Sequence, residues 1–289
     1  MHVLFVILSF LAAPPSPQAK AQIDLLRKEL RAENHEKAIE LGEKLVAANP
    51  SCSICYTWLG RSYGGKALKA SMFSKMSIAK KCRTAFEKAV ELDPTGMEAL
   101  FDLLGYYRNV PGIAGGGLDK ARALVPRIAA VRASRGHLAQ ASIYEKDEDV
   151  AKAEAEFRKA VEVEPTDSST IANLAGFLNR QKRPAEAMEV CRKAAAAHPD
   201  QPLFRYQIGR AAAMTGLEAD AGLKALDEYI AAPSHDEEAP SAADARWRRG
   251  QILEKLGKKA EARAEYEAAI ALEPEHSGAR RDLDKLKKS

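Results

Sequence analysis

One phrase recurs along this chain and restricts what it can fold into. In residues 153–165, Ala153, Phe157 and Ala160 precede Pro165. Spacings of four and three residues place these three side chains on one face of an α-helix, and the proline ends that helix. Further copies occupy residues 86–94 and 266–274, and a looser copy occupies residues 187–199. The closing prolines Pro165, Pro199 and Pro233 lie 34 residues apart, which indicates a repeat architecture rather than one globular core.

Composition supports helices packed closely on one another. Hydrophobic residues make up 46% of the chain and aromatic residues only 6%, while alanine is plentiful. These values favour helix–helix packing over a β core. The net charge of +4 is mild for 289 residues and does not indicate a nucleic-acid partner.

The amino terminus has the pattern of a secretory signal peptide. Residues 3–13 are apolar apart from Ser9, three prolines follow, and Ala19 and Ala21 form an A-x-A cleavage signal. We therefore expect residues 1–21 to be removed after Ala21 and the mature chain to be periplasmic or secreted. The alternative is a buried apolar helix. The run is too short for a stable membrane span, which needs about 20 residues.

The second repeat reveals a family resemblance. Tyr56, Leu59, Gly60 and Tyr63, followed by the phrase at residues 86–94, resemble the tetratricopeptide repeat, a helix–turn–helix unit of 34 residues. The resemblance extends over seven units, which start near Ala19, Ser53, Met97, Ser134, Ser168, Pro202 and Ala243. It implies an all-α fold, a right-handed superhelix of helix hairpins forming an α-solenoid. Residues 22–235 would hold repeats 1–6, residues 236–242 an acidic linker, and residues 243–289 repeat 7 with a capping helix.

Two insertions interrupt the repeat pattern, near residues 64–77 and 110–117. Long insertions in a repeat array map to one face and often carry binding. Residues 86–121 also resemble the T-component of TRAP transporters, a periplasmic helical-repeat family with P-x-x-x-G-G after paired aromatic residues. Here those residues are Tyr106, Tyr107, Pro111, Gly115 and Gly116. The chain lacks the family's anchoring cysteine after its signal, so the resemblance only suggests an association with solute uptake.

No constellation of catalytic, metal-binding or cofactor-binding residues stands out. Cys52 and Cys55 form a C-x-x-C motif without the βαβ context of a redox enzyme or the further ligands of a zinc site. In an oxidising compartment these two cysteines are able to form a local disulfide. At the second insertion, free N–H groups near Gly117 could hold an anion, but we expect Asp119 in the next turn to cap them instead.

Charge is unevenly distributed along the chain. Seven basic residues and no acidic residue lie between Gly60 and Phe86. Such a segment is either a solvated helix face or a surface that attracts an acidic peptide, lipid headgroups or nucleic acid, of which export disfavours the last.

In the tetratricopeptide family, the first helices of the units line a concave groove that binds peptides or partner helices. The resemblance implies that seven residues contact a partner in this groove: Arg61, Phe101, Arg108, Asn179, Tyr206, Arg210 and Trp247. We therefore expect a non-enzymatic exported scaffold that binds a protein or peptide and needs no cofactor. The alternative is a periplasmic solute-binding accessory of an uptake system, with a small-molecule ligand near residues 111–117.

Overall fold

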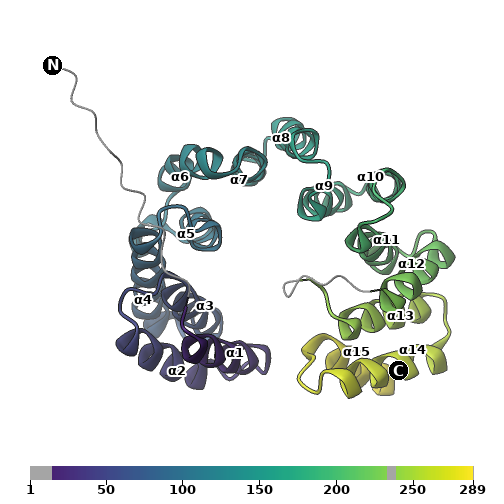
Figure 1. Ribbon diagram of the computed structural model, residues 1–289, viewed down its shortest axis with the longest axis horizontal. Helices are drawn as coiled ribbons and strands as arrows, with labels where there is room; N and C mark the ends of the chain where they lie inside the picture. The colour runs from purple at the N-terminus through teal and green to yellow at the C-terminus, as the bar shows by residue number, and fades with distance from the viewer. Residues whose placement is uncertain (1–14, 233–238, 289) are drawn as a thin grey trace. The chain divides into compact units, whose positions relative to one another are not determined.

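The computed structural model describes residues 15–232 and 239–288, which form α-helices joined by short turns (Figure 1). No strand occurs within these two ranges. The described residues form 15 α-helices and one 3-10 helix: α1 (Pro17–Arg31), α2 (His35–Ala48), α3 (Ser53–Lys69), α4 (Met72–Leu92), α5 (Met97–Asn109), η1 (Gly112–Ala114), α6 (Leu118–Val131), α7 (Ala133–Lys146), α8 (Val150–Val163), α9 (Ser168–Arg180), α10 (Pro184–Ala197), α11 (Pro202–Thr215), α12 (Ala219–Ala231), α13 (Ala242–Lys255), α14 (Lys259–Leu272) and α15 (Ser277–Lys288).

These helices pack as successive hairpins within two compact units. The first unit ends at Arg132 and holds the hairpins α1–α2, α3–α4 and α5–α6. The second, Ala133–Ser289, holds α7–α8, α9–α10, α11–α12 and α13–α14, followed by α15. The prediction of an all-α chain built from sequential helix hairpins is confirmed. The first helix of each hairpin begins within two residues of the unit start expected from the sequence.

The recurring alanine–aromatic–alanine phrase forms the buried face of the second helix in the α7–α8 and α13–α14 hairpins. In α8, Ala153, Phe157 and Ala160 are at most 2% exposed, and the side chain of Asp149 caps the helix by accepting a hydrogen bond from the Lys152 N–H. The ring of Phe157 lies 5.1 Å from that of Phe177 in the following helix α9. The phrase in α8 therefore joins its hairpin to the next one, as a repeat architecture requires.

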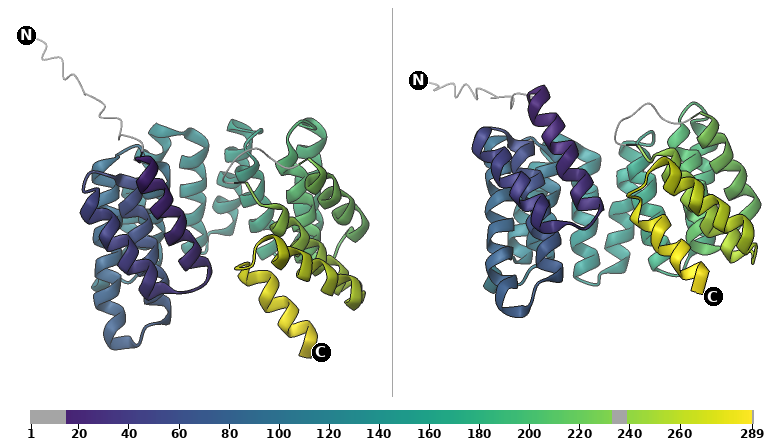
Figure 2. Two further views of the ribbon diagram at one scale, coloured as in Figure 1. Left: turned by 60° about the horizontal axis from the view of Figure 1, so that its bottom comes forward. Right: turned by 90° about the horizontal axis from the view of Figure 1, so that it is seen from below.

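The first insertion is helical and lengthens one hairpin. Helices α3 and α4 are 17 and 21 residues long, against 13 and 14 for α5 and α6. The extra residues are shared between the two helices, so the α3–α4 hairpin projects by roughly 7 Å at 1.5 Å per residue. Figure 2 shows its turn reaching past the neighbouring turns of the first unit. The residues of the expected insertion near 64–77 thus form a helical extension of this hairpin.

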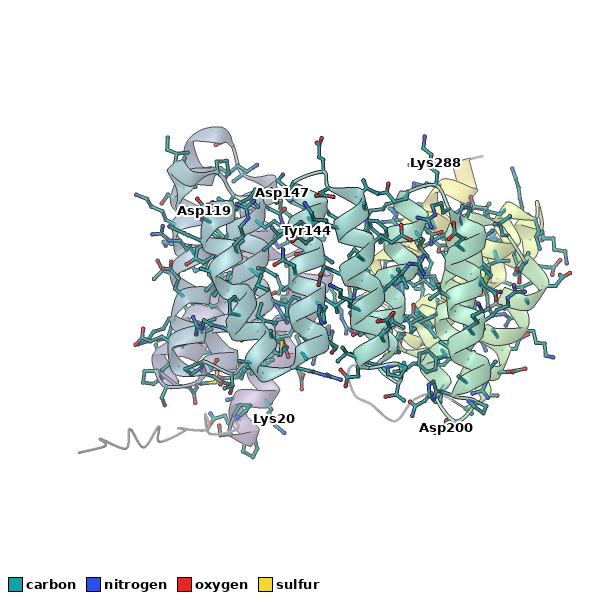
Figure 3. The ribbon with its side chains drawn as sticks, turned by 90° about the horizontal axis from the view of Figure 1, so that it is seen from above. Lys20, Asp119, Tyr144, Asp147, Asp200 and Lys288 are labelled. Atoms are coloured by element: carbon teal, nitrogen blue, oxygen red, sulfur yellow. A yellow bond between two sulfur atoms is a disulfide. The ribbon has the colours of Figure 1, made fainter. Side chains whose placement is uncertain are left out.

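The second insertion forms η1 and a glycine turn that closes on itself. The Tyr106 hydroxyl donates to the Ala114 carbonyl at 2.8 Å, and the Gly117 N–H donates to the Tyr107 carbonyl at 2.8 Å. The side chain of Asp119 is fully exposed and pairs with Arg122, and no side chain caps α6 (Figure 3). The expectation that Asp119 caps this helix is therefore wrong: the turn satisfies its own glycine N–H groups with backbone carbonyls.

The start of α1 bears on the expected signal peptide, of which residues 1–14 lie outside the described residues. Helix α1 begins at Pro17, and the Ser16 hydroxyl accepts a hydrogen bond from the Ala19 N–H at 3.1 Å. Ala19 is 2% exposed and packs with Ile23, Leu45 and Cys55. Cleavage after Ala21 would therefore remove the first turn of α1 from this core cluster. Residues 236–238 of the expected linker also lie outside the described residues, and the capping box of Ser241 and Asp244 begins α13.

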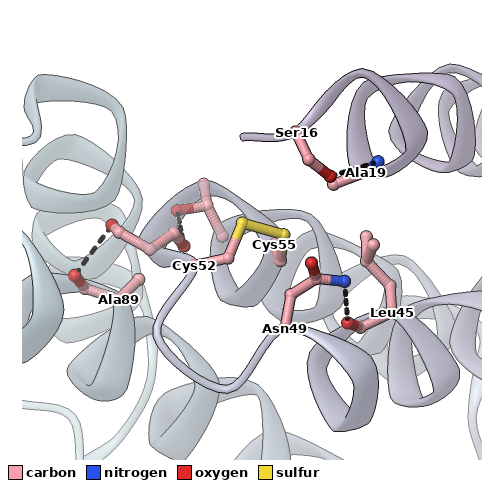
Figure 4. The surroundings of a disulfide bond; sticks show 9 residues. Ser16, Ala19, Leu45, Asn49, Cys52, Cys55 and Ala89 are labelled. Carbon is pink, nitrogen blue, oxygen red and sulfur yellow. Dashed lines mark hydrogen bonds between the residues drawn. A yellow bond between two sulfur atoms is a disulfide. The ribbon is translucent and has the colours of Figure 1, made fainter. Parts of the chain in front are cut away.

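Cys52 and Cys55 form a disulfide at the start of α3 (Figure 4). Cys52 is the N-cap residue of this helix and is half-buried, whereas Cys55 is fully buried. Cys82 and Cys191 are free and buried, and burial raises the pKa of each thiol to about 12. Of the four cysteines, the C-x-x-C pair alone is oxidised.

Candidate functional site

A pocket of about 650 Å³ lies in the second unit, between α9 and α11. Its walls come from the last turn of α9, the turn into α10 and the second half of α11. The lining residues are Gly176, Asn179, Arg180, Lys182, Pro184, Arg210, Met214 and Thr215. Two of the seven residues that the family resemblance assigned to partner binding, Asn179 and Arg210, therefore face one cavity.

Asn179, which lines this pocket, carries a buried hydrogen-bonding atom without a partner. It follows the fully buried residues Phe177 and Leu178, which fix the last turn of α9 against the core. Its Oδ1 atom is buried and has no hydrogen-bond partner within the described part of the chain. A buried acceptor without a partner costs about 1–3 kcal/mol.

Arg210 supplies positive charge from the opposite helix. Its guanidinium donates one long hydrogen bond, 3.5 Å to the Gln207 Oε1 atom, and pairs with no carboxylate among the described residues. Arg180, by contrast, donates to Glu145 at 2.7 and 3.0 Å. The exposed Lys182 adds a further charge on the turn between α9 and α10. No carboxylate is among the lining residues, so Arg210 and Lys182 give the pocket a net positive charge.

Tyr206 and Trp247, also predicted to contact a partner, engage other parts of the second unit. Tyr206 is 5% exposed, its ring lies 5.4 Å from that of Tyr229, and burial raises the pKa of its hydroxyl. Trp247 is half-buried against α15, where its Nε1–H donates to Asp282 at 2.8 Å. Tyr206 therefore packs within the α11–α12 hairpin, whereas Trp247 joins α13 to α15 away from the pocket.

The three predicted residues of the first unit lie on α3 and α5. Arg61 is held between these helices, 2.6 Å from Asp102 and 2.8 Å from Glu98, with its guanidinium 4.4 Å from the ring centre of Trp58. Phe101 and Arg108 are half-buried on α5. Arg61, a candidate partner-binding residue, thus already pairs with two carboxylates of its own chain.

Arg180, Lys182 and Met214 line this pocket but are not among the seven residues expected to bind a partner. A signal was present in residues 180–183, which read Arg-Gln-Lys-Arg at the turn of the fifth unit. Family contact positions are defined on the first helix alone, so they omit the turn that forms one wall of the cavity.

Other kinds of site are not found in the described ranges. No group of three or more His, Cys, Asp or Glu side chains there is arranged to hold a metal ion. Within the same ranges, no helix is long and apolar enough to cross a membrane.

Comparison with known families decides the class of the chain. The family described as "Tetratricopeptide repeat" matches residues 145–211 and, in a second match, residues 243–276. The chain contains tetratricopeptide repeats in these two ranges. The match over residues 243–276 begins at Ala243, the unit start expected from the sequence. The match over residues 145–211 includes the pocket residues from Gly176 to Arg210. Neither match includes residues 86–121, and nothing supports their resemblance to the TRAP T-component.

A solved structure, that of yeast Tom70, supports the same fold. Yeast Tom70 is 15% identical, with a TM-score of 0.58, over 97% of this chain and 58% of that chain. A tetratricopeptide repeat protein from Parabacteroides merdae is 13% identical over 95% of this chain and all of its own, with a TM-score of 0.49. One from Thermus thermophilus is 19% identical over 67% of this chain and 98% of its own, with a TM-score of 0.46. No curated protein matches the sequence.

Proposed function

We propose that this tetratricopeptide repeat protein is a non-enzymatic, exported scaffold that binds an extended acidic peptide in the pocket between α9 and α11. Repeat arrays of this class bind partners along extended surfaces, which makes a protein or peptide the expected partner. The observation that carries the proposal is the pairing of an unsatisfied Asn179 amide with an Arg210 guanidinium that lacks a carboxylate.

The two side chains fit complementary parts of a peptide. The Asn179 side chain has one acceptor and an amide donor, so it can bond the N–H and C=O groups of one extended residue. Arg210 presents a planar fork of donors that suits a carboxylate, with Lys182 beside it as a second positive charge. An extended segment with an acidic side chain or a free carboxyl terminus would bind all three side chains, Asn179, Arg210 and Lys182.

Export is supported by the amino-terminal pattern and by the disulfide. Cys52 and Cys55 form a disulfide, and disulfides persist in oxidising compartments. A cut before Ser16 would preserve the cap of α1, whereas a cut after Ala21 would remove Ala19 from the core. The intact mass of the chain from its own host distinguishes these two sites, and a retained amino terminus would contradict export.

The peptide proposal is tested by selecting binders from a random-peptide display library on the full chain. Enriched peptides should be acidic, and their affinity is then measured by fluorescence anisotropy. Arg210→Gln and Asn179→Ala should each weaken binding by roughly tenfold or more, because each removes a buried or charged hydrogen bond.

Matched controls lie on the same two helices. Arg205 on α11 pairs with Glu228, and the Asn173 side chain on α9 donates to the Ser169 carbonyl, so neither lines the pocket. Arg205→Gln and Asn173→Ala should leave the affinity unchanged. The proposal fails if no acidic peptide is enriched, or if the control variants lose as much affinity as the pocket variants.

A further inference from the structure

The outer end of the α3–α4 hairpin carries a concentration of lysine. We define this surface, the hairpin tip, as residues 66–81. It holds Lys66, Lys69, Lys75, Lys80 and Lys81 and contains no acidic residue and no arginine. The tip projects beyond the neighbouring turns of its unit, and the adjacent α1–α2 hairpin contacts its first lysines through Glu33 and Glu36.

Nearby carboxylates balance only part of this charge. Lys66 lies 3.5 Å from Glu36, Lys69 lies 2.5 Å from Glu33, and Lys81 lies 3.9 Å from Glu43. Exposed ion pairs of this kind contribute little to stability, so these lysines can readily exchange their carboxylate partners for another anion. Lys75 and Lys80 are exposed and pair with no carboxylate among the described residues.

The tip also exposes apolar side chains between its lysines. Leu68 is 81% exposed and Met76 is 37% exposed. A leucine this accessible gains free energy when an apolar phase covers it. The lysine side chains beside it are long enough to keep their charged ends in water while their stems lie on apolar surface.

We propose that the hairpin tip docks on an anionic lipid surface. Its chemistry distinguishes lipid from a protein partner, since protein interfaces are enriched in arginine and depleted in lysine. Lysine point charges around an exposed aliphatic residue instead suit a layer of anionic headgroups above an apolar phase. Attachment is peripheral, and it does not depend on the peptide pocket, which lies in the other compact unit.

The test is flotation of the full chain with vesicles of phosphatidylcholine alone or mixed equally with phosphatidylglycerol. The chain should float with the mixed vesicles only, and raised salt should release it because screening weakens surface charge interactions. Lys75→Gln/Lys80→Gln should weaken binding by about 25-fold, at a factor of about five for each lysine. Leu68→Ser should weaken it by about tenfold.

The matched control removes two exposed lysines elsewhere, as Lys224→Gln/Lys285→Gln, and should bind like the wild type. All variants keep the same amino terminus, so any contribution from its apolar run is common to them. Circular dichroism should show equal helix content, since the altered side chains are exposed.

Two results would overturn the proposal. One is equal binding by the tip variants and the control variant. The other is a wild-type chain that ignores phosphatidylglycerol vesicles but binds polyglutamate through the same lysines, which would assign the tip to an acidic protein.

Discussion

The ring of Phe86 occupies the space that a side chain at residue 60 would need. An added Cβ at Gly60 would overlap this ring, and the same relationship recurs between Gly250 and the ring of Tyr266. Ten more residues separate the first pair in the sequence than the second. The extra residues of the α3–α4 hairpin therefore lie at its outer end, and the close contact between Gly60 and Phe86 is the same as in the α13–α14 hairpin.

Gly60→Ala should destabilise the first unit by about 1–3 kcal/mol, because the methyl group displaces a buried aromatic ring. Gly64 lies on the same helix, and a Cβ there would meet only the Cys82 Sγ atom at 3.7 Å. Gly64→Ala should thus be neutral or stabilising by about 0.5–1 kcal/mol, as expected for alanine in a helix. Urea unfolding measures both, and equal losses would show that the ring does not set the helix separation.

Stability towards acid should depend on Asp282, which is 8% exposed between α13 and α15. Burial raises the pKa of this carboxyl, but hydrogen bonds from Trp247, Arg281 and Gln251 outweigh burial and hold the pKa below its usual range. A carboxyl with a lowered pKa in the folded state stabilises the protein above its unfolded pKa of about 3.9. That contribution is lost as the pH falls through the lower folded value.

Asp282→Asn should therefore lower the free energy of unfolding at neutral pH by about 1–3 kcal/mol and flatten its decline below about pH 4. Asp284→Asn is the control, because Asp284 is exposed on the same helix. Urea unfolding at a series of pH values provides the measurement. An Asp282→Asn variant with an unchanged acid dependence would rule out this role.

The thiols should differ sharply in their reaction with N-ethylmaleimide. Without reductant no cysteine should react quickly, because Cys52 and Cys55 are paired and the pKa of about 12 keeps Cys82 and Cys191 protonated. After mild reduction Cys52 should react first, since Cys55 is fully buried. Peptide mapping by mass spectrometry identifies the labelled sites.

Reduction should also cost about 2 kcal/mol of stability, the loop-closure value for so short a disulfide loop. A Cys52→Ser/Cys55→Ser variant should show no such change with reductant. Labelling of Cys52 in the oxidised wild type would contradict the disulfide.

The sequence by itself determined the helices and their order. The spacing of Ala153, Phe157 and Ala160 is a local property of one helix, so it could be recognised without knowing which neighbour covers it. The same holds for the prolines that close the units. The sequence indicates extra residues near 64–77, but their helical form depends on the turn closing α3 onto α4, for which the sequence carries no repeat signal.

Only the tertiary structure decided which side chains are available to a partner. Asn179 and Arg210 belong to different hairpins and meet because α9 and α11 pack side by side. Tyr206 shares α11 with Arg210 yet is buried by Tyr229, and Arg61 is neutralised by Asp102 and Glu98. Repeat positions define a direction on a helix, whereas exposure and charge balance depend on side chains from neighbouring helices, which the period does not specify.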